Sequence, residues 1–283
     1  MTELADAGAR VYCRTGSYSP PLLGLDFNTI GMVLGPNSRL SDSEMVHLER
    51  FTELERLDLK DTQVTSAGLT HIERLSKLDW LMLAGTRVDD DGLGHLRGLT
   101  NLKFLFLNRT QITDRGLVHL KGLTGLEVLS LAQTQVGDAG LAQLEGLAGL
   151  EFLHLDGTQV GDVGLAHLAG MSRLSELSLT GSRVTGAGLR HLKRLPRLTS
   201  LRLDGTQVND AAVECLSDMR SLLDIQLSGT TLTDATLGPL KRLTRLRQLD
   251  LKGTSVTKAG VDDLKKALPN VTITLQRTGA YHL

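Results

Sequence analysis

Several features common in other protein classes are scarce or absent in this 283-residue chain. Its 31 Lys and Arg nearly balance its 32 Asp and Glu, for a formal net charge of −1. There is therefore no electrostatic case for binding nucleic acid or an anionic membrane. No stretch approaches the roughly 20 apolar residues of a membrane-spanning helix. The start of the chain contains Glu3 and Asp6 and lacks the apolar core of a secretory signal, so we expect a soluble, cytoplasmic protein.

A repeat of 24 residues begins at Phe51 and keeps its phase without insertion to about Ala267. Each copy follows the pattern L-x-x-L-x-x-L-x-L-x-x-T-x-V-x-x-x-G-L-x-x-L, for example from Leu99 to Leu120. One such unit cannot bury its own apolar face, whereas copies stacked on one another form a continuous core. Nine copies in register therefore predict a solenoid.

Each repeat contains two periodicities. The L-x-L pair, such as Leu105 and Leu107, alternates with period 2 and predicts one short strand. The G-L-x-x-L stretch, such as Gly140, Leu141 and Leu144, favours one or two helical turns on the other side of the coil. Stacked repeats then form a curved parallel sheet with strands about 4.8 Å apart.

The repeat resembles the leucine-rich-repeat signature L-x-x-L-x-L-x-x-N-x-L, with Thr or Ser in place of Asn. The end of the repeat, as in Ile112 to Leu117 and Leu232 to Leu237, is similar to repeats common in bacterial, notably planctomycete, proteins and in the ribonuclease-inhibitor-like superfamily. The resemblance implies an α/β fold: a right-handed leucine-rich-repeat horseshoe with a parallel concave β-sheet and short helices on the convex side. It does not imply a particular function. The residues at the Asn position are Thr62, Thr86, Thr110, Thr134, Thr158, Ser182, Thr206, Thr230 and Thr254.

Two columns of the repeat are interpreted as structural. Hydroxyl groups of the Thr column can donate hydrogen bonds to loop carbonyls of the neighbouring turn. Glycines of the column from Gly68 to Gly188 allow close packing of one coil on the next.

The domain organisation follows from where the repeat phase begins and ends. We expect an N-terminal cap and first partial repeat over residues 1–50, nine repeats over 51–267, and a C-terminal cap strand and tail over 268–283. The alternation of Val271 and Ile273 predicts that last strand.

Within the N-terminal cap, Ala9–Cys13 and Leu22–Phe27 are predicted as strands and Asn28–Arg39 as a loop. The two cysteines, Cys13 and Cys215, lie far apart in a solenoid whose repeats contact only their neighbours. A disulfide between them is not expected, which favours a reducing compartment.

Aromatic residues make up only 3% of the chain, yet they gather at outward positions beside the L-x-L pairs. These positions should form a contiguous apolar surface of a few hundred Å², the size typical of interaction sites. Aromatic anchors flanked by polar side chains are also typical of binding hot spots. We define the aromatic patch as Trp80, Met82, Phe104, Phe106, Val128 and Phe152, and its predicted polar neighbours are His154, Asp156, Arg202 and Asp204.

The pattern predicts a non-enzymatic module that binds an unidentified protein or peptide on the concave face. Alternatives are a carbohydrate or small apolar ligand on the same face, coverage by the Asn28–Arg39 loop, or a homodimer. Further along the sheet, Glu176, Asp204, Asp224 and Asp250 face Arg202 and Lys252. This mildly acidic half could steer a basic segment of a partner, or it could be an ordinary solvated face.

Two constellations invite a chemical interpretation. One is a column of histidines that could share a transition metal, although the column also contains Gln, Cys, Pro and Asp, so we expect a structural role and no metal. The other is Ser130, His154 and Asp156, whose positions on neighbouring strands suggest a nucleophile, a base and an acid. Residues i and i+2 of a strand are roughly 7 Å apart and project in parallel, so we expect no catalytic site and no cofactor. The histidines of the column are His47, His71, His95, His119, His167 and His191.

Overall fold

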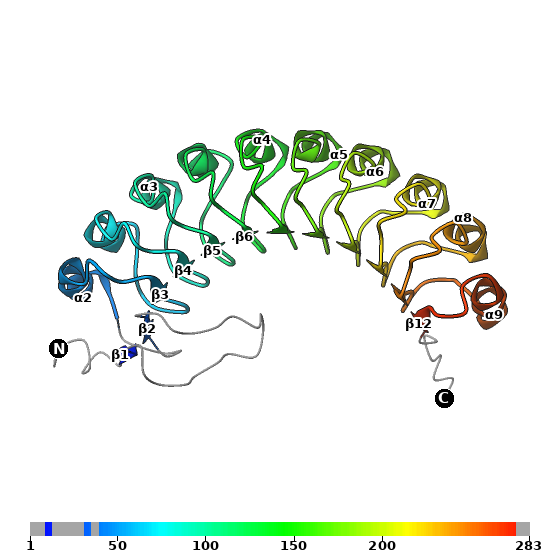
Figure 1. Ribbon diagram of the computed structural model, residues 1–283, viewed down its shortest axis with the longest axis horizontal. Helices are drawn as coiled ribbons and strands as arrows, with labels where there is room; N and C mark the ends of the chain where they lie inside the picture. The colour runs from blue at the N-terminus through cyan, green and yellow to red at the C-terminus, as the bar shows by residue number, and fades with distance from the viewer. Residues whose placement is uncertain (1–8, 13–30, 35–39, 276–283) are drawn as a thin grey trace, which may run out of the picture.

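The computed structural model describes residues 9–12, 31–34 and 40–275, the side chains only over 40–275. This part of the chain forms an open horseshoe, with strands lining the inner, concave side and helices the outer, convex side (Figure 1). Twelve described strands form one sheet in chain order, β1 to β12. The predicted α/β horseshoe is therefore confirmed.

The sheet is parallel except at its N-terminal edge. β1 (Ala9–Tyr12) pairs antiparallel with β2 (Gly31–Leu34), and every later pairing is parallel. The remaining strands are β3 (Arg56–Asp58), β4 (Trp80–Met82), β5 (Phe104–Phe106), β6 (Val128–Ser130), β7 (Phe152–His154), β8 (Glu176–Ser178), β9 (Ser200–Arg202), β10 (Asp224–Gln226), β11 (Gln248–Asp250) and β12 (Thr272–Thr274).

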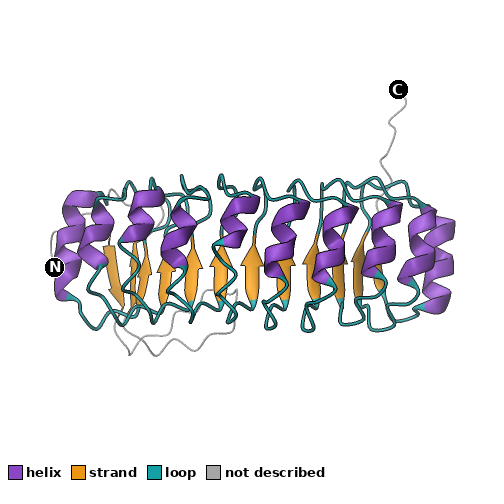
Figure 2. Ribbon diagram, turned by 90° about the horizontal axis from the view of Figure 1, so that it is seen from above, coloured by secondary structure: helices purple, strands orange, loops and turns teal. Residues whose placement is uncertain are grey.

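Short α- and 3₁₀-helices follow the strands and cover one face of the sheet in a single row (Figure 2). The α-helices are α2 (Asp42–Met45), α3 (Asp90–Gly94), α4 (Asp138–Ala142), α5 (Asp162–Leu165), α6 (Gly186–Leu192), α7 (Asp210–Leu216), α8 (Leu237–Leu240) and α9 (Lys258–Ala267). The 3₁₀-helices are η1 (Val46–Arg50), η2 (Gly68–Ile72), η3 (Gly116–Leu120), η4 (Ala166–Leu168) and η5 (Asp234–Thr236).

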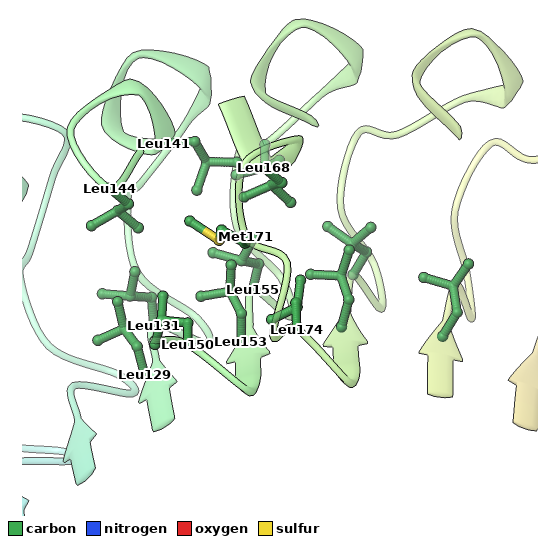
Figure 3. Packing of buried hydrophobic residues seen from close by; sticks show 14 of the residues in the cluster. Leu129, Leu131, Leu141, Leu144, Leu150, Leu153, Leu155, Leu168, Met171 and Leu174 are labelled. Atoms are coloured by element: carbon green, nitrogen blue, oxygen red, sulfur yellow. The ribbon is translucent and has the colours of Figure 1, made fainter. Parts of the chain in front are cut away.

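A continuous leucine core lies between the strands and the helices. In the central repeats, Leu129 and Leu153 project from the strands towards Leu141 and Leu144 of the helical side, and all are fully buried (Figure 3). Because every repeat contributes apolar residues at equivalent positions, the core runs unbroken through the stack. None of the described helices is long and apolar enough to cross a membrane.

The Thr column bonds within its own turn and not to the neighbouring one. Thr86 Oγ1 donates to the carbonyl oxygen of Leu83 at 2.7 Å, and the other Thr members do the same three residues back. The expected bond to the next turn is therefore wrong, because the carbonyl of the same tight turn is nearer. Ser182 is the exception, since its buried Oγ has no hydrogen-bond partner within the described part of the chain.

An aspartate column that the sequence analysis missed connects consecutive repeats. Asp162 Oδ1 accepts the backbone N–H of Thr185 at 2.8 Å, and its Oδ2 accepts the Thr185 hydroxyl at 2.6 Å. The same pattern recurs along the solenoid, with a Gly N–H as the donor in two repeats. Each carboxylate thus satisfies a backbone donor where the next helix begins. The other column members are Asp42, Asp90, Asp114, Asp138, Asp210 and Asp234.

At the N-terminal end, the structure corrects one expectation. Gly31–Leu34, predicted inside a loop, forms strand β2, which pairs in parallel with β3 so that Met32 lies opposite Leu57. Without β2 the first repeat would leave an open strand edge, which folded proteins normally cover. β1 lies where a strand was predicted, whereas the predicted strand Leu22–Phe27 is outside the described residues.

Candidate binding surface on the concave face

Sheet register brings the aromatic patch together on β4 to β7. Trp80 lies opposite Phe104, Phe104 opposite Val128, and Val128 opposite Phe152. A second row lies two residues further along each strand and consists of Met82, Phe106, Ser130 and His154. Leu81 and its equivalents alternate with them and point into the core, so these two rows project from the concave face.

The large side chains of the patch remain partly exposed, and two of them, Trp80 and Phe106, form an aromatic pair. The Trp80 and Phe106 rings lie 5.7 Å apart between centroids at an interplanar angle of 54°, a tilted geometry favourable for aromatic pairs. The partly exposed residues are Trp80, Met82, Phe104, Phe106 and Phe152.

Val128 differs from the expected solvent-facing position, because only 4% of it is exposed. In the sheet register it lies between Phe104 on β5 and Phe152 on β7, which both have larger side chains. Ser130, which lies between Phe106 and His154 in the register, is likewise only 1% exposed. Val128 is therefore a buried member of the aromatic patch and does not face solvent.

A polar network that the sequence analysis did not identify borders the patch. Glu176 Oε1 lies 3.1 Å from Arg202 Nη2 and 3.4 Å from His154 Nε2. The close approach of the His154 imidazole, with a smaller effect of the Arg202 charge, lowers the pKa of Glu176. His154 and Arg202, both predicted site residues, are thus joined through one carboxylate.

The two predicted aspartates have different partners. Asp156 accepts a hydrogen bond from the Ser178 hydroxyl. Asp204 accepts the Ser228 backbone N–H at 2.8 Å and the Thr180 hydroxyl at 3.5 Å. Burial raises the pKa of Asp204, and the nearby charge of Asp250 raises it further.

Ser130, His154 and Asp156 do not form a nucleophile, base and acid relay. The Ser130 hydroxyl has no hydrogen-bond partner among the described residues, while His154 is directed to Glu176 and Asp156 is bonded to Ser178. The expected parallel projection of i and i+2 side chains keeps Asp156 from orienting the His154 ring.

On the convex side, His71, His95 and His167 of the histidine column pair with glutamates, whereas His119 contacts Arg97. His71 Nδ1 lies 2.6 Å from Glu49 Oε1, and His95 Nδ1 lies 2.5 Å from Glu73 Oε1. The partner belongs to the preceding repeat, where it lies two residues after the position of the histidine column. This spacing is visible in the sequence. Over the described ranges, no group of three or more His, Cys, Asp or Glu side chains is placed to hold a metal ion.

At the C-terminal end of the concave face lies a small polar hollow of about 90 Å³. Asp224 lines this hollow. Burial is the main cause that raises its pKa, and the charges of Glu176 and Asp204 raise that pKa further. Asp250, also in the wall, pairs with Lys252 at 3.1 Å. The hollow is lined by Asp224, Gln226, Gln248, Leu249, Asp250, Thr272 and Thr274.

Comparison with solved structures places the fold among leucine-rich-repeat proteins. An internalin of Listeria monocytogenes is 21% identical, with a TM-score of 0.55 over 87% of this chain and 79% of its own. A leucine-rich-repeat protein of Leptospira interrogans is 19% identical, with a TM-score of 0.63 over 81% of this chain and 62% of its own.

The ectodomain of the Arabidopsis receptor kinase HAESA, solved with a peptide hormone, is 17% identical, with a TM-score of 0.60 over 80% of this chain and 39% of its own. No protein-family model and no curated protein matches the sequence. Identities this low establish the fold and leave the function to the surface described above.

Proposed function

We propose that this leucine-rich-repeat solenoid is a non-enzymatic interaction module that binds a protein or peptide on its concave face. The binding surface consists of the aromatic patch with His154, Asp156, Arg202 and Asp204 beside it. The observation that carries the proposal is the row of large apolar side chains on β4 to β7 that remain partly exposed in a chain with 3% aromatic residues. A globular protein normally buries such residues or uses them for binding.

The fold neighbours support this class of function. The HAESA ectodomain was solved in complex with a peptide hormone ligand, so a leucine-rich-repeat solenoid can present a peptide-binding surface. In this chain, the short strands hydrogen-bond fully to their neighbours between β2 and β12, so a partner would dock on the face of the sheet and not add a strand to it.

The proposal is tested by affinity capture from a lysate of the source cell. The wild-type chain is compared with a Trp80→Ala/Phe104→Ala/Phe106→Ala variant and with a control, Val118→Ala/Val163→Ala, which removes apolar side chains exposed away from the concave strands. We expect a protein that the wild type and control retain and the triple variant loses, with all three chains folded by circular dichroism. Identical eluates from all three chains would refute the proposed surface.

The cellular compartment and oligomeric state belong to the same proposal. Cys215 is a free thiol, while Cys13 lies outside the described residues. We propose a cytoplasmic location, with a homodimer through the aromatic patch as an alternative to partner binding. Sedimentation at increasing concentration tests the alternative in which a second copy covers the patch, since a dimer dissociated by the triple variant would identify that copy as the occupant.

A further inference from the structure

On the premise of the proposed function, we infer that the partner is an extended polypeptide segment with two anchors. A large apolar side chain lies on the aromatic patch, and a Lys or Arg side chain lies between Asp204 and Asp224. The partner segment crosses the strands along the concave face towards the C-terminal end of the solenoid.

The negative charge of the concave face between β7 and β11 favours a cationic group on the partner. From β7 to β11 the concave side carries five carboxylates and two cations, an excess of three negative charges in a chain whose net charge is −1. The excess is therefore local and compensated elsewhere on the molecule. A surface of one sign favours and steers a segment of the opposite sign. The charged residues are Asp156, Glu176, Asp204, Asp224 and Asp250, with Arg202 and Lys252.

Both local cations already have partners. Arg202 lies 3.1 Å from Glu176, and Lys252 lies 3.1 Å from Asp250. In the described structure no Lys or Arg nitrogen lies within ion-pair distance of Asp204 or Asp224. Asp156 beside β7 also lacks such a partner, but Asp204 beside β9 and Asp224 on β10 are neighbouring carboxylates that can share one incoming charge.

Burial makes such a charge favourable at this position. Both aspartates are partly removed from water, which raises the pKa of each and disfavours the ionised form in the free protein. An ammonium or guanidinium group beside them would stabilise the ionised form. The hollow next to Asp224 provides Gln226 and Gln248 as further polar groups for its N–H donors.

The distance between the anchors sets the spacing in the partner. Asp224 on β10 is three strands from Phe152 on β7 and five from Phe106 on β5. At about 4.8 Å between strands, the separation is about 14 to 24 Å, which an extended chain covers in about four to seven residues. From β5 towards β10, the sheet face thus presents first an apolar site and then an acidic site.

A random library of 12-residue peptides, displayed on phage and selected on the immobilised full chain, tests this inference. We expect selected peptides to contain an aromatic or large aliphatic residue about four to seven positions from a Lys or Arg. Selection of uncharged or acidic peptides would overturn the inference.

The best selected peptide is then synthesised and titrated by fluorescence anisotropy against three chains. Asp204→Asn/Asp224→Asn keeps side-chain shape and should weaken binding about tenfold or more, whereas the control Asp91→Asn/Asp262→Asn, which removes the same charge from exposed residues of the helices, should change it less than about twofold. A peptide with its Lys or Arg replaced by Gln should no longer distinguish the wild type from the first variant.

The two proposals fail in different ways. If Trp80→Ala/Phe106→Ala abolishes peptide binding and Asp204→Asn/Asp224→Asn leaves it unchanged, the cation site is refuted and the proposed function stands. If selected peptides bind both variants as tightly as the wild type, the concave site itself is refuted.

Discussion

A side chain on Gly188 would collide with Asp162 of the preceding repeat, because a Cβ there would lie 2.5 Å from Asp162 Oδ1. The same relationship holds at most positions of the glycine column, where the carboxylate that caps the next repeat occupies the space of a Cβ. One repeat inverts it. There, Gly186 replaces the aspartate and Ala212 replaces the glycine, and a Cβ on Gly186 would lie 2.6 Å from that of Ala212.

We expect Gly188→Ala and Asp162→Gly to be individually destabilising but mutually compensating. The first should lower the free energy of unfolding by about 1–3 kcal/mol through overpacking. The second should lower it by about 1.5–3 kcal/mol, because it removes two hydrogen bonds to a charged acceptor. The double variant recreates the natural Gly186 and Ala212 pair, so its loss should be smaller than the sum by about 1 kcal/mol or more.

Urea unfolding of the four chains measures this coupling. Gly94→Ala is the matched control, because no atom lies within 4 Å of a Cβ placed there, and it should be neutral or slightly stabilising. Single-variant losses that add to within about 0.5 kcal/mol would show that the two positions are independent.

Replacing Ser182 by Thr should stabilise the protein. The Ser182 hydroxyl is buried without a partner, whereas the Thr hydroxyls of the column bond the carbonyl three residues back. The β-branched Thr side chain has fewer rotamers and is held in the bonding one. We expect the free energy of unfolding to rise by about 1 kcal/mol. Thr158→Ser is the reverse control and should lower it, while a Ser182→Thr variant no more stable than the wild type would contradict the explanation.

The sequence was sufficient for the horseshoe because each repeat carries the same leucines, and nine repetitions average out local ambiguity. β2 was missed because Gly31–Leu34 lies outside the repeat phase, and only the open edge of β3 calls for a strand there. The placement of Trp80, Phe104, Phe106 and Phe152 on the concave face was predictable, since strand alternation fixes which side chains project from it, whereas the burial of Val128 was not. The contacts of Glu176 were not, because they depend on how long side chains reach across β7, β8 and β9.

Glu176→Gln should destabilise the protein at neutral pH and have a smaller effect in acid. The pKa of Glu176 is lowered in the folded state, so its ionised form adds stability above the pKa of the unfolded chain, and this stability is lost as pH falls through the folded value. Melting temperatures of wild type and variant at pH 7 and pH 3 provide the measurement. A difference as large at pH 3 as at pH 7 would mean that the carboxylate contributes by packing and not by charge.

Asp224→Asn should change stability in the opposite direction. Burial raises the folded-state pKa of Asp224, so the folded protein holds this proton more tightly than the unfolded chain, and stability decreases as pH rises from the unfolded pKa through the folded one. Asn carries no charge to desolvate, so the variant should melt higher than the wild type at pH 7, and the difference should disappear near pH 3, where both side chains are neutral. A wild type as stable as the variant at pH 7 would show that ionised Asp224 is not destabilising in the folded protein.

The expected gain in stability of Asp224→Asn matters for function, because a carboxylate that lowers stability at neutral pH is of a kind that proteins commonly retain at binding sites. The same substitution should then raise the melting temperature and weaken binding of a basic peptide, a pairing that a purely structural aspartate would not produce.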